Sequence, residues 1–296
     1  MNAQERTDWS EGDRDDLFEW SITEALFAMP PTIFVTAWAG HIPFLFALIK
    51  LARPRSYVEL GVHFGGSFVA ACAAVQRYRT DTVCIGIDNW QGDLHAGKYE
   101  GDEIFERLLK YLDSNFSTAI LYRENFSDGL KHVEDGSVDI LHFDGLHTFD
   151  AIQQDFLSWS PKLSKRGIAL FHDTAVKEAE FGVWKFWEEI KSSYRTMEFF
   201  HSAGLGVAFI GQEQPEAVQR MLSLWETNTA FREFFRTTCE HLGRALPDRM
   251  ATPTLDAVNI LTTRCRTWKL LWPITRFSKA FRLVASLNES GTRKWR

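Results

Sequence analysis

"TMEFFHSAGLGVAFIG", residues 196–211, contains two short apolar runs that only the segment SAGLG separates. A connection of this length allows an antiparallel hairpin, but it is too short for the right-handed crossover that joins parallel strands. The stretch therefore predicts a sheet that closes with an antiparallel hairpin.

Upstream of this hairpin, apolar runs rich in Val and Ile alternate with helix-like segments. The runs lie at 56–60, 82–87, 118–122, 138–143 and 167–172, and the helical segments at 66–78, 101–115, 125–133, 148–160 and 180–193. Such an order predicts βαβ units and a parallel sheet that helices cover on both faces. We expect an α/β fold with a Rossmann-like sheet of five parallel strands plus a C-terminal antiparallel hairpin.

The rest of the chain predicts two helical extensions, so we divide it into 1–54, 55–211 and 212–296. An apolar stretch at 33–49 is interrupted by Gly40, His41 and Pro43, and predicts a buried helix beginning near His41 in place of a membrane span. Residues 264–296 hold nine Lys or Arg against one acid. This basic segment predicts either a solvated helix or a contact with an anionic membrane surface or a protein partner.

Composition and charge favour some classes of protein over others. With 45% hydrophobic residues and a net charge of −6, the chain of 296 residues is typical of a globular protein that does not bind nucleic acid. Four cysteines without a CxxC pair predict buried free thiols, and the acidic N-terminus lacks the features of a signal peptide. We expect a cytoplasmic protein, peripheral to the inner face of the membrane if the basic segment binds lipid, and we leave homo-oligomers open.

The segment "VELGVHFGGSF", residues 58–68, has the glycines of a ligand-binding turn. Gly61, Gly65 and Gly66 allow a tight turn that presents the next helix N-terminus to a ligand. Glu59 suits an amine or another cation better than a pyrophosphate, and Asp88, at the end of the second run, can accept hydrogen bonds from ribose hydroxyls. A ribose, a positive centre and no phosphate together predict S-adenosylmethionine.

Two further runs each end on an acid and a histidine. "LHFDGLHTFD" (141–150) contains Asp144 and His147, and "ALFHDT" (169–174) contains His172 and Asp173. Carboxylates that converge at one sheet edge repel unless they are paired or hold a cation. We expect a divalent metal, magnesium in the first place, on Asp144, His172 and Asp173, although the imidazole favours manganese or iron and a metal-free site stays open. His147, as a neutral general base, and Asp144 are the catalytic candidates.

These segments, with "GIDNWQGDLHAGKY" (86–99) and "GLGVAFIG" (204–211), resemble bacterial class I S-adenosylmethionine-dependent methyltransferases. The similar group is that of macrocin O-methyltransferase and the cephalosporin-hydroxylase-like proteins, and the resemblance spans residues 38–211. It implies that Gly61 and Gly65 meet the methionine part of the donor and Asp88 the ribose, with Trp90, Phe126 and Ser127 near the adenine. It also implies a divalent metal at the acid-histidine cluster.

The leading hypothesis is an O-methyltransferase, metal-assisted, that acts on a hydroxyl of a sugar, a glycan or a glycosylated natural product. One alternative is an iron-dependent hydroxylase on the same fold. Another is a non-catalytic scaffold that docks on a glycan-assembly enzyme through residues 264–296. An NAD-dependent oxidoreductase is disfavoured by Glu59 and by the closing hairpin.

Overall fold

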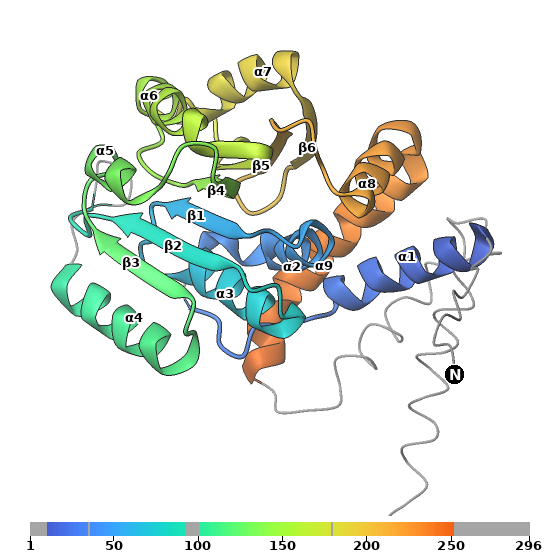
Figure 1. The fold of residues 1–296 in the computed structure, drawn as a ribbon, viewed down its shortest axis with the longest axis horizontal. Helices are drawn as coiled ribbons and strands as arrows, with labels where there is room; N and C mark the ends of the chain where they lie inside the picture. Colours follow the sequence, from blue (N-terminus) through green and yellow to red (C-terminus); the bar gives the residue numbers. More distant parts are fainter. Residues whose placement is uncertain (1–10, 35, 93–96, 98–100, 179, 252–296) are drawn as a thin grey trace, which may run out of the picture. The chain divides into compact units, whose positions relative to one another are not determined.

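The computed structural model describes residues 11–34, 36–92, 97, 101–178 and 180–251 (Figure 1). Residues 25–250 form one compact unit, and helix α1 (Glu11–Leu26), 16 residues long, belongs almost wholly to a second unit. The basic segment 264–296, predicted to contact a membrane or a partner, lies outside the described residues. The division of the chain at residues 54 and 211 stays a prediction.

Within the described residues, seven strands form one sheet in the order β3-β2-β1-β4-β5-β7-β6. They are β1 (Ser56–Leu60), β2 (Val83–Asp88), β3 (Ala119–Arg123), β4 (Val138–Phe143), β5 (Leu163–His172), β6 (Arg195–Phe199) and β7 (Leu205–Phe209). Strands β1 to β5 are parallel, and β7 runs antiparallel to both β5 and β6. The predicted Rossmann-like sheet with its closing hairpin is confirmed.

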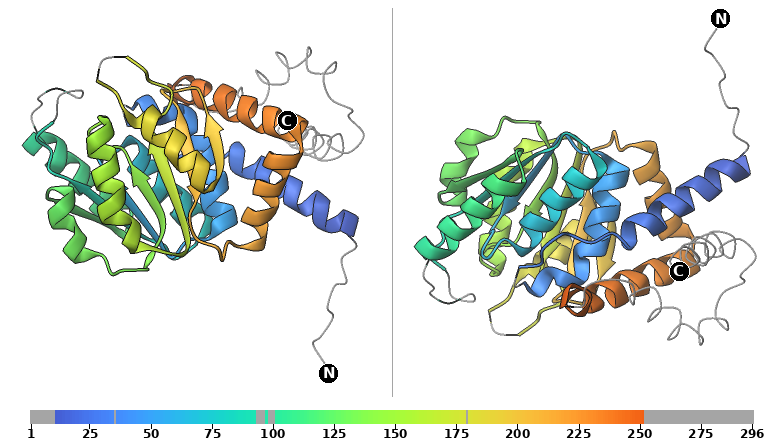
Figure 2. Two further views of the ribbon diagram at one scale, coloured as in Figure 1. Left: turned by 90° about the horizontal axis from the view of Figure 1, so that it is seen from above. Right: turned by 90° about the horizontal axis from the view of Figure 1, so that it is seen from below.

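Helices cover both faces of the sheet (Figures 1 and 2). The α-helices of the compact unit are α2 (Ile42–Ala52), α3 (Gly66–Tyr78), α4 (Gly101–Asn115), α5 (Phe126–Gly129), α6 (Phe149–Trp159), α7 (Val183–Ser193), α8 (Glu216–Thr227) and α9 (Thr229–Ala251). Short 3₁₀ helices occupy Ala37–His41, Leu130–His132 and Ser160–Lys162. Helices α6 and α7 lie over one face, whereas α2 and α3 lie over the other.

Two elements differ from their predicted bounds by more than three residues, and the others lie closer to them. The helix predicted at 125–133 is one α-turn followed by a 3₁₀ turn, and Gly129 packs so closely on Ile87 that a Cβ there would lie 2.8 Å from the isoleucine side chain. Strand β5 begins at Leu163, four residues before the predicted start, because Leu163 pairs with Val138 across a register irregularity. Because residues 164–166 are polar, the apolar pattern did not indicate that this part of the chain belongs to the strand.

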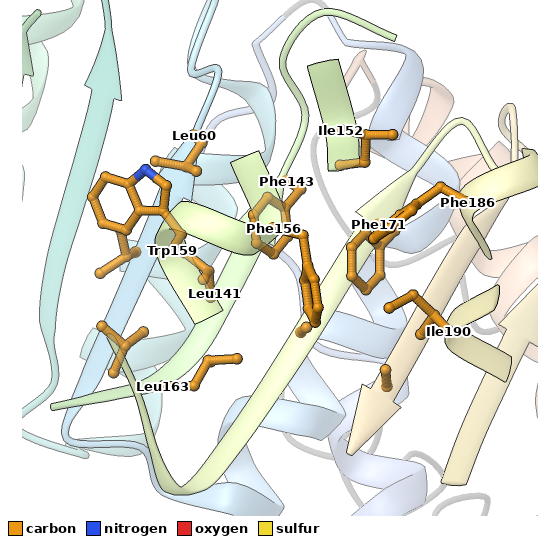
Figure 3. Packing of buried hydrophobic residues seen from close by; sticks show 14 of the residues in the cluster. Leu60, Leu141, Phe143, Ile152, Phe156, Trp159, Leu163, Phe171, Phe186 and Ile190 are labelled. Atoms are coloured by element: carbon orange, nitrogen blue, oxygen red, sulfur yellow. The ribbon is translucent and has the colours of Figure 1, made fainter. Parts of the chain in front are cut away.

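The core between the sheet and helices α6 and α7 combines aliphatic side chains with a group of aromatic rings (Figure 3). Phe143 of β4 and Phe171 of β5 stack with ring centroids 5.0 Å apart, and Phe156 and Phe186 pack on them from the two helices. Each such ring contributes about 1.5–3 kcal/mol by leaving water. This packing holds the carboxyl ends of β4 and β5 side by side, which is where the acid-histidine pairs follow.

Helix α2 confirms the buried helix predicted from the apolar stretch at 33–49. All of its residues except Lys50 are buried, and it contacts α3 and α8. Among the described helices, none combines the length and the apolarity that crossing a bilayer requires. Cys72, Cys84 and Cys239 are buried free thiols, as expected.

Candidate active site

A cavity of about 530 Å³ opens at the carboxyl ends of strands β1 to β5. This volume lies in the usual range for a site that takes a small molecule. Its lining includes nine of the predicted site residues, namely Gly61, Gly66, Asp88, Phe126, Ser127, Asp144, His147, His172 and Asp173. Gly65, Glu59 and Trp90 are not part of the lining.

Gly61 allows β1 and β4 to approach each other at the cavity. Its φ is +92°, and a Cβ at this position would lie 2.0 Å from the carbonyl oxygen of Asp144. The Asp144 amide donates to the Leu60 carbonyl at 2.9 Å, so the two strand ends remain hydrogen-bonded beyond the sheet. Gly61 thus sets the position of Asp144. Gly65 caps helix α3 from a left-handed conformation.

Asp88 organises the loop that follows β1. Its Oδ2 accepts hydrogen bonds from the amides of Val62 and His63, both at 2.9 Å, and its Oδ1 accepts one from the Trp90 amide at 2.6 Å. Trp90 is buried and donates through Nε1 to the His63 carbonyl at 2.9 Å. Asp88 can therefore accept only a few further hydrogen bonds, from donors on the cavity side. Trp90 stabilises the loop through its hydrogen bond to His63.

Glu59 lies below the cavity wall, although the sequence suggested contact with a cationic ligand. Its carboxylate is fully buried and accepts hydrogen bonds from the hydroxyls of Tyr57 and Ser67, the latter at 2.7 Å. It also meets Nδ1 of His142 at 3.0 Å. Because Ser67 lies in the first turn of α3, Glu59 ties that turn to strands β1 and β4 in place of meeting a ligand.

The two acid-histidine pairs converge as predicted. His172 Nδ1 lies 3.2 Å from Asp144 Oδ1 and 3.0 Å from Asp173 Oδ2. His147 Nε2 lies 3.0 Å from Asp173 Oδ2 and 3.8 Å from Asp144 Oδ1. Each carboxylate therefore faces both imidazoles, and the four side chains form one cluster.

The charges of this cluster compensate one another. Burial opposes the ionised form of Asp144, but the positive His172 and the hydrogen bonds from His147 and His172 outweigh it, so the pKa of Asp144 is lowered. Burial likewise opposes protonation of His147, yet hydrogen bonds to Asp144 and Asp173 raise its pKa to about 9. The same two carboxylates raise the pKa of His172 well above its usual value. Beside both carboxylates His147 is thus a cation at neutral pH, which differs from the expected neutral imidazole.

The side chains placed to hold a metal also differ from the predicted set of Asp144, His172 and Asp173. Ligand atoms of Asp144, His147 and Asp173 lie within 4.8 Å of one another, as a metal site requires. His172, predicted in place of His147, is only 5% exposed, and its Nε2 donates to the Ser202 carbonyl at 2.9 Å. With one nitrogen on a backbone carbonyl and the other between two carboxylates, His172 serves as an internal counter-charge.

The closing hairpin holds this cluster in place, a role that no sequence pattern indicated. Its turn places Ser202, Ala203 and Gly204 consecutively at positive φ. The Gly204 carbonyl accepts from the Asp173 amide at 3.1 Å, and Asp173 itself has a φ of +62°. The Ser202 carbonyl also accepts from His41 Nε2 at 3.1 Å. The hairpin tip thus fixes His172 and Asp173 through its backbone, where side-chain identity carries no signal.

His147 is further oriented from its own loop. Its ring stacks on Phe181 with centroids 4.9 Å apart and planes 10° apart, and its carbonyl accepts from the Gly182 amide at 2.7 Å. Phe181 also lines the cavity, and sequence reasoning missed it. An imidazole held flat against a ring has few alternative rotamers, so its Nε2 stays directed at the two carboxylates.

Comparison with known proteins adds a family and a relative. Residues 58–174 match the family model described as a methyltransferase domain. Over 183 residues the chain is 42% identical to the uncharacterized protein y4gI of Sinorhizobium fredii (strain NBRC 101917 / NGR234), an alignment that covers 62% of this chain. The chain spans only about a fifth of the length of that relative, 20%.

Similar solved structures include two methyltransferases at low identity. One is the SAH-bound methyltransferase PaMTH1 of Podospora anserina, 12% identical, with 68% of this chain and 88% of that one covered at a TM-score of 0.45. The other is the O-methyltransferase TomG of Streptomyces achromogenes in complex with SAM, 15% identical, with 69% and 100% covered at a TM-score of 0.44.

The contact between Gly61 and Asp144 predicts an unequal cost of two alanine substitutions. Gly61→Ala should lower the free energy of unfolding by about 2–4 kcal/mol, because left-handed strain adds to a backbone clash. Gly136→Ala, at a φ of +68° with nothing within 4 Å of its Cβ, should cost about 1 kcal/mol. Urea unfolding of both variants measures the difference, and equal losses would contradict the inferred close approach.

Proposed function

We propose that this protein is an S-adenosylmethionine-dependent O-methyltransferase acting on a sugar, a glycan or a glycosylated natural product, and the match of residues 58–174 to a methyltransferase domain supports this. One observation carries the proposal. The loop of Gly61, the acid Asp88 and the cluster of Asp144, His147 and Asp173 line the same cavity. Residues suited to hold the donor and residues suited to accept a proton thus line one cavity, which supports the proposal. The cytoplasmic location stays part of this proposal.

The donor would lie over the ends of β1 and β2. Its methionine part would follow the Gly61 turn toward the first turn of α3, and its ribose hydroxyls would donate to the remaining lone pairs of Asp88. The ring of Phe126 and the hydroxyl of Ser127 border the cavity beyond Asp88, where the adenine would lie. This arrangement leaves the methyl group directed toward the acid-histidine cluster.

The chemistry is a displacement at the methyl carbon. The acceptor oxygen forms the new O–CH₃ bond while the S–CH₃ bond breaks, and the bonding electrons return to sulfur as neutral S-adenosylhomocysteine leaves. His147 takes the proton that the hydroxyl loses, which requires its Nε2 lone pair to be free. Because Asp144 and Asp173 favour the protonated form of His147, their charge must be compensated before His147 can act as the base.

A divalent cation fits that requirement. The carboxylates of Asp144 and Asp173 supply oxygen ligands that magnesium or manganese accepts. A cation held by Asp144 and Asp173 would compensate their charge, leaving His147 neutral, and would polarise the acceptor hydroxyl. His172 behind the carboxylates reduces the net charge that such a cation has to balance.

An iron-dependent hydroxylase is the second candidate. Ferrous iron also accepts histidine together with carboxylates, and His147, Asp144 and Asp173 supply such a set. Hydroxylation would require oxygen and bound iron, whereas methyl transfer requires neither, so metal analysis and an anaerobic assay separate the two.

Donor binding is tested first by calorimetric titration with S-adenosylmethionine. Wild-type protein should bind in the micromolar range, and Asp88→Ala should lose binding because it removes the ribose acceptor and releases the amides of the β1 loop. Asp81→Asn, an exposed acid before β2, is the matched control and should bind like wild type. Absence of wild-type binding would refute the methyltransferase and favour a scaffold.

His147→Ala should separate catalysis from donor binding. We expect transfer of the labelled methyl group to a panel of glycans and glycosylated products to fall by about 10²–10⁴-fold, the usual loss with a general base. The dissociation constant for the donor should stay within about twofold, because His147 faces the acceptor side. Undiminished transfer by His147→Ala would exclude it as the base.

Removal of divalent cations tests the metal. Chelation should reduce methyl transfer and added magnesium or manganese should restore it, while Asp173→Asn should weaken manganese binding by about tenfold or more, since it removes a charged ligand. Transfer that withstands chelation, with no manganese bound to wild-type protein, would refute a metal as the group that compensates the charge of Asp144 and Asp173.

A further inference from the structure

Asp155 on helix α6 presents an unpaired carboxyl group to the cavity. Ala151, Gln154 and Asp155 line the cavity at the i, i+3, i+4 spacing of one helix face. A neighbouring face of the helix, with Ile152, Phe156 and Trp159, is buried in the core. The helix is thus anchored from behind, and Asp155 has a fixed place on the cavity wall.

This carboxyl group has no partner among the residues that the structure describes. The other described acids of the cavity wall all have partners. Asp88 accepts three backbone amides, Glu124 pairs with Lys131 and His132, and Asp144 and Asp173 face two histidines. Burial alone raises the pKa of Asp155 to about 6. A half-buried acceptor without a protein donor is unfavourable, and a ligand that donates an N–H group reduces the penalty.

The surroundings of Asp155 define the shape of that ligand. A Cβ built on Gly145 would lie 2.4 Å from the Phe126 ring and 3.6 Å from Asp155 Oδ2, so ring and carboxyl group border the same glycine. A flat apolar surface with an acceptor at its rim is complementary to a planar aromatic ring that carries an amino group at its edge. Gly145 leaves the space between them open.

We propose that Asp155 accepts a hydrogen bond from the exocyclic amino group of the donor's adenine and so selects adenine over bases without that group. The inference rests on the proposed function, because it assumes a donor whose ribose lies at Asp88 and whose base continues toward Phe126. The ammonium group of the methionine part is the other N–H donor of such a ligand, and the experiment distinguishes the two.

The test compares S-adenosylhomocysteine with its 6-deamino analogue, in which hydrogen replaces the amino group of the purine. Both ligands are titrated into wild-type protein, Asp155→Ala, Asp155→Asn and Asp150→Ala. Asp150 is exposed in the first turn of the same helix and serves as the matched control. Circular dichroism and thermal unfolding establish that each variant is folded.

Wild-type protein should bind S-adenosylhomocysteine about 10- to 100-fold more tightly than the analogue, the usual value of a hydrogen bond to a charged group. Asp155→Ala should lose this preference without losing affinity for the analogue. Asp155→Asn should keep a smaller preference, since a neutral amide oxygen accepts from the same amino group without the charge, and Asp150→Ala should equal wild type.

Two results would overturn the inference and leave the proposed function intact. These are a wild-type protein that binds both ligands equally, and an Asp155→Ala variant that keeps the full preference. The second would be expected if Asp155 met the ammonium group, because its loss would then weaken both ligands alike. Failure of wild-type protein to bind either ligand would instead overturn the proposed function, and the inference with it.

Discussion

Two carboxylates at adjacent strand ends would repel each other, and the structure depends on the two imidazoles that prevent this. Asp144 follows β4 and Asp173 follows β5, and His147 and His172 lie between them as cations. Like charges at such distances in a poorly solvated site cost several kcal/mol without compensation. His172 keeps its position through the Ser202 carbonyl, so the hairpin that closes the sheet is also the support of the cluster. The same hairpin completes the sheet and supports the cluster. These contacts offset the strain of its turn, in which residues 202–204 all have positive φ.

Much of the fold could be predicted from sequence because its signals are local. Continuous apolar strands, helices of ten to fifteen residues and the short SAGLG connection each depend on a few neighbouring residues, and together they allow one sheet with a closing hairpin. The convergence of Asp144, His147, His172 and Asp173 could also be predicted, since it follows from parallel strands ending at a common edge. The early start of β5 could not, because Leu163 joins the sheet through tertiary pairing with Val138 and not through an apolar pattern.

The roles of individual side chains were harder to predict, for a reason that β1 illustrates. Residues 57–60 of this strand are all buried, since helices cover both faces, so period-two alternation does not reveal which way Glu59 points. Its hydrogen bonds to Ser67 and His142 involve residues 8 and 83 positions away. Long-range contacts also explain why the sequence predicted His172, and not His147, as the histidine of the metal-ligand set. Both lie near strand ends, and the carbonyl of Ser202, a backbone group on a distant turn, helps to assign His172 to the interior.

The charge on the cavity wall connects these details to the choice of ligand. Asp88, Glu124, Asp144, Asp155 and Asp173 line it, and no lysine or arginine does among the residues that the structure describes. Such a wall disfavours a pyrophosphate, which argues against a nicotinamide dinucleotide more strongly than Glu59 did, since Glu59 lies below the wall. It favours a sulfonium cation instead. Because methyl transfer converts that cation into a neutral thioether, the same field that attracts the proposed donor holds its product less strongly, and release of product would follow from the chemistry itself.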